Sequence, residues 1–191
     1  MRPWIAAAFA ATSLAACATA EPDRGAMDRV TPRQAWIVGA EGAAIGQAMF
    51  TEGPRGVMIR LELSANALPP GWHGVHLHGI GNCSDRAAGF QASGSHLGHD
   101  EDGPQHGLMN PAGSEQGDLP NLFAPPNAPF GAEYYVAGAT LANDLEDRAR
   151  FELLDDDGTA LLIHAGPDDQ QSQPIGGAGA RIACAALTQL P

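Results

Sequence analysis

Six of the seven histidines in this chain lie between residues 73 and 106, and the seventh, His164, ends the apolar segment ALLIH. His76 and His78 form an H-x-H pattern in the segment GVHLHGI. Residues two apart on a strand point to the same face, so both imidazoles can reach one ion. Imidazole is the commonest metal ligand in proteins and suits copper, zinc, iron and nickel. The histidines therefore predict a transition-metal site; the alternative is a polar, histidine-rich loop without an ion.

The elements that must position these histidines are strands. Two alternating apolar runs, 45–50 and 57–63, flank a turn containing Gly53, Pro54 and Gly56, which predicts a hairpin. A second hairpin is expected over 151–164, where Asp157-Gly158 is a strong turn dipeptide. GVHLHGI is a third strand candidate. No segment has a sustained helical period with caps, so the predicted class is all-β.

Glycine and proline are abundant in two stretches, 79–129 and 166–179. Long loops in a compact domain usually carry function. His164 is thus expected at the end of a rigid strand that faces loops.

The N-terminal segment is typical of an export signal. MRPW is a short cationic start, and the apolar run IAAAFAATSLAA that follows is too short to span a bilayer. The run ends in LAAC, which resembles a bacterial lipobox, so we expect a signal peptide over 1–16, acylation of Cys17 and a polar tether over 17–31. The alternative is an ordinary secretory signal cut nearby. Both place the protein in an exported, periplasm-facing location, and with acylation its only membrane contact is the lipid anchor.

Residues 32–191 have the length of one domain with a sizeable core. The chain has 22 Asp and Glu against 10 basic residues, all of them arginine, a balance that argues against nucleic acid and anionic membranes as partners. Cys83 and Cys184 remain once Cys17 is assigned to the anchor, and two cysteines in an exported domain predict one disulfide. No interface signature indicates an oligomeric state.

Five sequence motifs follow one another along the chain: GWHGVHLHGIGNC, ASGSHLGH, QHGLMNPAGSEQGDLPN, LLIHAGPDD and GGAGARIAC. In this order they resemble the bacterial copper-zinc superoxide dismutases, and the resemblance covers about residues 30–187. It implies an eight-stranded Greek-key β-barrel with long metal-binding and electrostatic loops. It also implies a copper-dependent oxidoreductase that acts on superoxide.

The resemblance implies a complete copper site. Its four ligands are His76, His78, His96 and His164, of which His96 also bridges to zinc. Four imidazoles suit tetragonal Cu(II). His96 and Arg181 are the expected catalytic residues, since His96 supplies a proton and Arg181 attracts the substrate anion.

Two further residues are assigned by the same resemblance. Asp168 corresponds to the carboxylate that links a copper histidine, His76, to a zinc histidine, His106. His73 corresponds to no ligand and is expected at the surface.

The zinc site departs from the family pattern. Besides the bridging His96, His106 and Asp118 correspond to zinc ligands, but Glu115 stands where the family has a third histidine. An insertion before His106 also carries His99. Three outcomes stay open: Glu115 binds zinc directly, His99 replaces the missing ligand, or zinc is absent and the enzyme uses copper alone.

Superoxide dismutation, giving oxygen and hydrogen peroxide, is the expected function. The alternative is an exported lipoprotein that binds or sequesters copper without significant catalysis. A catalytically silent barrel is a third hypothesis, which four retained copper ligands together with Arg181 disfavour.

Overall fold

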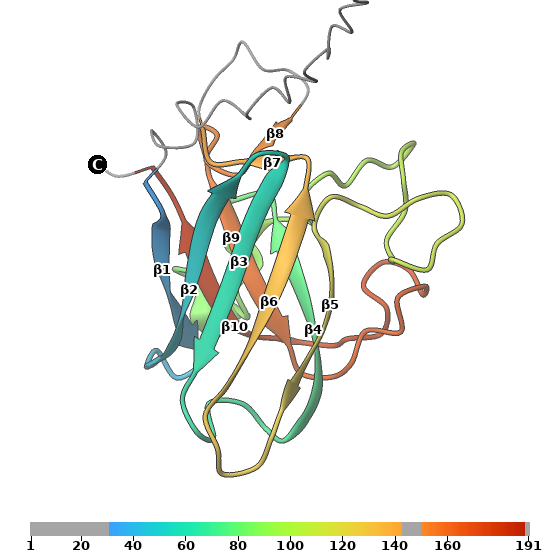
Figure 1. The fold of residues 1–191 in the computed structure, drawn as a ribbon. Coiled ribbons are helices and arrows are strands. Elements are labelled where there is room, and N and C mark those ends of the chain that lie inside the picture. The colour runs from blue at the N-terminus through green and yellow to red at the C-terminus, as the bar shows by residue number, and fades with distance from the viewer. Residues whose placement is uncertain (1–30, 143–149, 190–191) are drawn as a thin grey trace, which may run out of the picture.

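The computed structural model describes residues 31–142 and 150–189. Within them eight antiparallel strands form one sheet that curls into a barrel (Figure 1), in the order β5-β4-β9-β10-β1-β2-β3-β6. The end strands β5 and β6 approach each other, so the barrel is nearly closed. The barrel strands are β1 (Arg33–Gly39), β2 (Ala44–Gly53), β3 (Gly56–Leu63), β4 (Gly71–His78), β5 (Asp118–Ala124), β6 (Phe130–Ala137), β9 (Thr159–His164) and β10 (Arg181–Leu187). The predicted all-β barrel is confirmed.

The remaining elements are short. A parallel pair, β7 (Ala139–Thr140) with β8 (Phe151–Glu152), lies outside the barrel sheet, and two single-turn 3-10 helices, η1 (Arg86–Ala88) and η2 (Gln91–Ser93), interrupt the first long loop. In the part of the chain that the structure describes, no helix combines the length and apolar character required to cross a membrane. The predicted signal peptide, Cys17 and nearly all of the tether lie outside the described residues.

The first predicted hairpin is confirmed as β2 and β3, which pair from Gly46 with Leu63 to Gly53 with Gly56. Along β3 buried and exposed side chains alternate, as expected for a strand with one face on the core. The inward side chains of β3 are those of Val57, Ile59, Leu61 and Leu63, all in the main core.

β4 is buried on both faces, and this positions the first two histidines. Val75 and Leu77 point into the barrel core, so the alternation along the strand sends His76 and His78 to the outer face. Both histidines are nevertheless fully buried. His164, at the end of the neighbouring strand β9, is also buried outside the barrel core.

Two long loops account for this burial, one over residues 79–117 and one over 165–180 (Figure 1). Under the first loop, Phe90 and Cys184 pack in a small apolar cluster with Ala160 and Leu162 on the outer face of β9. The predicted disulfide between Cys83 and Cys184 is confirmed, with a Cα–Cα distance of 5.8 Å. It attaches the first loop covalently to β10.

The second predicted hairpin is wrong. β8 pairs with β7, whereas β9 pairs with β4 and β10. Leu153 and Leu154 are adjacent and both buried, which one-sided alternation along a strand does not permit, so the chain leaves the extended path there. The Asp157-Gly158 turn, with Gly158 at φ 71°, directs the chain into the central strand β9 instead.

The predicted loop over residues 79–129 also needs correction, because β5 occupies its later part, 118–124. The strand contains Pro120, and it lies at one end of the strand order, where a missing backbone donor is tolerated.

Candidate metal centre

Four histidines converge on the outer face of β4 and β9. One ring nitrogen from each lies within 4.8 Å of the other three, and all four side chains are buried. They are His76, His78, His96 and His164, the four residues that the sequence assigns to copper. His96 joins β4 through an isolated bridge with His78, so the first long loop is fastened to the strand at the cluster itself.

Some ring nitrogens of this cluster lack a hydrogen-bond partner, and a bound metal ion would supply the missing interaction. The Nε2 atoms of His78 and His96 are buried without a hydrogen-bond partner. Nδ1 of His76 lies 3.1 Å from Nε2 of His164, so two acceptor-capable atoms face each other with one proton between them at most. Buried polar atoms are normally paired. The donor set therefore fits copper, for which four imidazoles are suitable ligands.

The other ring nitrogens are held by the surrounding backbone. Nδ1 of His78 donates to the carbonyl of Gly94 at 2.8 Å, and Nδ1 of His164 donates to the carbonyl of Gly179 at 2.9 Å. These bonds fix each ring and leave Nε2 directed at the cluster, as bonds to the second nitrogen do for metal-bound histidine.

Burial keeps these imidazoles neutral. It lowers the pKa of His78 to about 2 and that of His164 to about 4. The pKa of His76 is also lowered by burial, although its hydrogen bond to Asp168 opposes the shift. Metal ligation needs the neutral form of histidine, so the lowered pKa values of these three residues favour the form that binds a metal.

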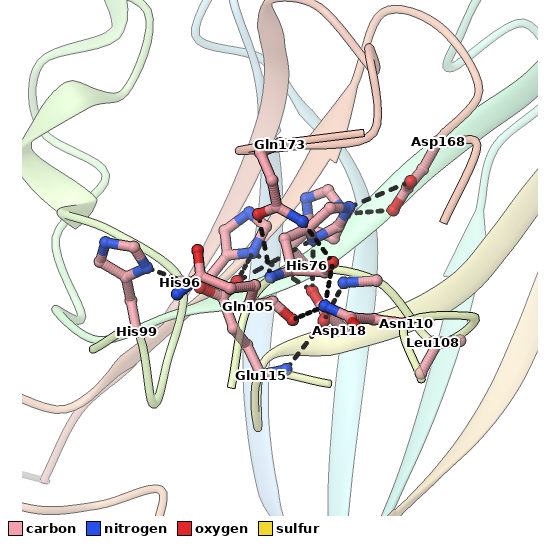
Figure 2. Close-up of polar contacts among 12 residues, drawn as sticks. His76, His96, His99, Gln105, Leu108, Asn110, Glu115, Asp118, Asp168 and Gln173 are labelled. Carbon is pink, nitrogen blue, oxygen red and sulfur yellow. Dashed lines mark hydrogen bonds and ion pairs between the residues drawn. The ribbon is translucent and has the colours of Figure 1, made fainter. Parts of the chain in front are cut away.

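A second cluster adjoins the first and shares His96 with it. His96, His106, Glu115 and Asp118 place one donor atom each within 4.8 Å of one another, and all four residues are buried. Figure 2 shows His96, Glu115 and Asp118 of this cluster. Nδ1 of His106 lies 2.7 Å from Oδ1 of Asp118. Hydrogen bonds from histidine overcome the effect of burial and hold the pKa of Asp118 well below its usual range.

His106 carries the complementary charge in this second cluster. Although burial opposes it, hydrogen bonds to Asp118 and Asp168 raise the pKa of His106 to about 10. Without a cation the ring is therefore an imidazolium between two carboxylates. A metal bound at Nδ1 takes the place of one of its protons, as metal binding generally does at histidine.

Asp168 connects the two clusters. Its Oδ2 lies 2.8 Å from Nε2 of His76, and its Oδ1 lies 3.2 Å from Nε2 of His106. Asn121 holds the backbone of Asp168 from both sides, accepting from its N–H at 2.9 Å and donating to its carbonyl at 2.8 Å. Gly176 packs so closely that a Cβ there would lie 1.6 Å from Oδ1. The carboxylate is thus fixed in contact with both His76 and His106.

Arg181 begins β10 opposite His164 and is half-buried. Its guanidinium donates to the carbonyls of Phe90 and Gly94, each at 2.9 Å, and to the hydroxyl of Ser93 at 3.0 Å. The Gly94 carbonyl also accepts from His78. Arg181 therefore binds loop carbonyls and lies beside the four-histidine cluster.

The predicted surface position of His73 is wrong. Its side chain is 2 % exposed, and its two ring nitrogens lie 2.7 Å from the carbonyl of His164 and 2.8 Å from that of Pro69. His73 belongs to neither donor cluster among the described residues. It is a buried histidine that pairs with backbone.

Sequence reasoning also missed Gln173. Its amide accepts from the N–H of His106 at 3.2 Å and donates to the carbonyl of the same residue at 2.9 Å. These bonds join the second long loop to the first at the second metal cluster. The only sequence signal is the segment QQSQP after the aspartate pair, which does not distinguish a structural amide from a solvated one.

Fold and site together define a class of protein, an antiparallel β-barrel that carries two adjoining clusters of metal-binding side chains. The two clusters share one histidine and lie under two long loops. The copper/zinc superoxide dismutase family model matches residues 44–187. Two curated relatives are "Superoxide dismutase [Cu-Zn]" of Caulobacter vibrioides, 40% identical over 79% of this chain and 82% of that protein, and "Superoxide dismutase [Cu-Zn] 2" of Aquifex aeolicus, 35% identical over 79% and 83%. The chain belongs to the copper/zinc superoxide dismutase family.

Solved structures agree with the fold. A double mutant of a superoxide dismutase-like protein from Bacillus subtilis superposes with a TM-score of 0.71 at 31% identity, covering 82% of this chain and 97% of that one. The Cu/Zn superoxide dismutase from Brucella abortus gives a TM-score of 0.56 at 26% identity, covering 82% and 99%.

Proposed function

We propose that the protein disproportionates superoxide to oxygen and hydrogen peroxide at the four-histidine cluster. The observation that carries this proposal is the convergence of four buried imidazoles, two of them with unpartnered Nε2 atoms, beside the half-buried cation Arg181. Bound copper supplies a one-electron couple, by which one superoxide is oxidised to oxygen and a second, with two protons, is reduced to hydrogen peroxide.

The chain's own residues prepare this reaction. Arg181 supplies a fixed positive charge for the substrate anion in a chain with a formal net charge of −12. His96 is 6% exposed at the junction of the two clusters, and we assign it the delivery of one proton: Nε2 would take this proton from solvent when it is not bound to copper, while the second cluster holds Nδ1. Asp168 keeps His76 oriented, with Nδ1 turned toward the copper position.

Copper sequestration without catalysis is the alternative function, and one experiment separates the two. The purified protein is loaded with one equivalent of copper, and superoxide consumption is measured against the same concentration of free copper. Dismutation requires cyanide-sensitive consumption well above the free-copper rate. A copper-loaded protein that does not exceed that rate is a binding protein, and the proposed activity is then wrong.

Arg181→Gln tests the role of the cation. Because the positive charge is removed beside the copper ligands, we expect kcat/KM for superoxide to fall about 10-fold, within the range that electrostatic steering contributes. The salt dependence of kcat/KM should fall with it. Stopped-flow kinetics at several ionic strengths measure both, and Arg55→Gln, far from the ligands in sequence and at the tip of the β2–β3 hairpin, is the control. An unchanged rate and salt dependence in Arg181→Gln would refute steering by this residue.

We also propose that the protein is exported and anchored through acylated Cys17, facing the periplasm. The lipobox-like LAAC, the short apolar run before it and the Cys83–Cys184 disulfide support this location. Cys17→Ser should release the protein from the membrane fraction, whereas the parent chain should stay there and carry fatty acid detectable by mass spectrometry. Parent protein that is recovered soluble and without lipid would indicate an ordinary secretory signal.

A further inference from the structure

We propose that Glu115 is a metal ligand of the second cluster and that His99 positions it, so that this cluster binds zinc through two imidazoles and two carboxylates. This inference rests on the proposed function in one respect, because His96 serves both clusters. It concerns the position where this chain departs from its family.

The donor atoms have the spacing of a zinc site. Oε2 of Glu115 lies 2.7 Å from Nδ1 of His96 and 3.9 Å from Nδ1 of His106. Oδ1 of Asp118 lies 3.3 Å from the first nitrogen and 2.7 Å from the second. Tetrahedral zinc with bonds of about 2.0 to 2.2 Å places its ligands about 3.3 to 3.6 Å apart. The four measured nitrogen–oxygen distances, from 2.7 to 3.9 Å, lie on both sides of that separation.

Two buried carboxylates face two imidazole nitrogens in this cluster. Glu115 and Asp118 both approach Nδ1 of His96, and Oδ1 of Asp118 also lies 2.7 Å from Nδ1 of His106. The two carboxylate side chains are nearly inaccessible to water, at 2% and 0% exposed. Buried carboxylates need cationic partners. A divalent cation satisfies both carboxylates and both nitrogens together.

Each carboxylate is prepared in the same manner, with one oxygen held outside the cluster and one directed into it. Oδ2 of Asp118 accepts from the backbone N–H groups of Gly107 at 2.7 Å and Glu115 at 3.0 Å. Oε1 of Glu115 accepts from Nδ1 of His99 at 2.6 Å (Figure 2). His99 thus does for Glu115 what backbone amides do for Asp118, and it leaves Oε2 free to bind the ion.

The chain brings His99 to this place by a tight turn. The N–H of His99 donates to the carbonyl of His96 at 3.1 Å, and Gly98 between them has φ 77°, a backbone conformation that favours glycine. A Cβ on Gly98 would lie 2.9 Å from Cγ of Gln116, the neighbour of Glu115. The turn therefore presents His96 and His99 to opposite oxygens of one carboxylate, and His99 itself stays at the rim with 37% of its side chain exposed.

The test measures zinc affinity in full-length protein that already holds one equivalent of copper. Zinc is titrated against a chelating dye, and Co(II) is used as a spectroscopic probe, because its visible absorption reports coordination geometry. The parent should bind one further equivalent. Glu115→Ala and the near-isosteric Glu115→Gln should each raise the zinc Kd at least about 100-fold, and His99→Ala should raise it about 10- to 100-fold.

Two variants make the result specific. His99→Asn keeps a donor near the place of Nδ1 and should recover most of the affinity and the parental Co(II) spectrum, whereas His99→Ala should alter that spectrum. Glu101→Ala, the same substitution at an exposed carboxylate of the same loop, should match the parent.

The proposal is overturned if the parent binds no second cation, or if both Glu115 variants keep a zinc Kd within about threefold of the parent. The positioning role fails if His99→Ala leaves affinity and spectrum unchanged. Dismutase activity of the same copper-loaded samples is measured separately. Activity without a second cation would refute only this inference, and zinc binding without activity would refute only the proposed function.

Discussion

His78→Ala should lose its dismutase activity, with kcat/KM for superoxide at least about 100-fold below that of the parent. Loss of a residue that only supports a metal ligand costs about 10- to 100-fold, and loss of a ligand itself should cost more. His78 is 0% exposed, its Nε2 has no hydrogen-bond partner, and its Nδ1 is fixed by the Gly94 carbonyl. The substitution removes one of four donors directly. Bound copper, measured by elemental analysis after dialysis, should fall with the activity.

The second cluster provides the internal control for this variant. His78 is absent from that donor set, so zinc content should stay near that of the parent. His78→Gln keeps a side-chain amide that can still donate to the Gly94 carbonyl. If both variants lose copper, the imidazole Nε2 is required; if His78→Ala retains one tight copper and parental kcat/KM, the copper assignment of this residue is wrong.

Two parts of the metal site were predictable from local signals, although its assignment to copper came from the family resemblance. The H-x-H spacing places two side chains on one face of β4 independently of the conformation of the loops, and the apolar run before His164 indicates the end of a strand. The disulfide follows from the number of cysteines and the expected compartment. His96, in contrast, follows only from the family resemblance, since nothing local marks it among the loop histidines.

The parts that failed depend on contacts between distant segments. His73 is buried because a strand 91 residues away presents the carbonyl of His164 to it. The expected hairpin over 151–164 is absent because β9 pairs with β4 on one side and with β10 on the other. All six residues of β9 are buried, as is typical of a central strand covered on both faces. Turn dipeptides indicate where the chain bends and not which strand pairs with the next.

The environment of Glu115 falls between these cases. The sequence identifies it as the odd residue in a zinc motif and leaves three outcomes open. The contacts with His96 and His99 span 19 and 16 residues of loop and depend on a turn at Gly98. Loop register of this kind is not encoded by a short-range period, so only the structure could place His99 behind Glu115 and Glu115 among the donors.

Removal of the Cys83–Cys184 disulfide should cause a large loss of stability in the domain. The two cysteines are 101 residues apart, and cross-linking a loop of about 100 residues restricts the unfolded chain by about 4.7 kcal/mol in the entropy model. We expect the double variant Cys83→Ala, Cys184→Ala to lose about 3 to 5 kcal/mol of unfolding free energy. Urea denaturation of metal-free protein measures this, because bound metal would add its own stabilisation.

Packing and cross-linking must be separated for that measurement to be decisive. Cys184 is 0% exposed and packs against Phe90, Ala160 and Leu162, so an alanine there also leaves a small void. The single variant Cys83→Ala retains the fully buried Cys184 sulfur and loses the link together with the partly buried Cys83 sulfur, and it should still lose most of the free energy. A loss below about 1 kcal/mol would mean that the loop is held without the bond.

The same variant should weaken substrate capture. The disulfide and the Arg181 hydrogen bonds to Phe90 and Gly94 attach the same loop to β10, at two positions of the strand that are three residues apart. With the covalent tie gone, the hydrogen bonds of Arg181 and the contacts of His78 with Gly94 and His96 must hold the loop, and the charge that attracts superoxide is less firmly fixed beside His78 and His164.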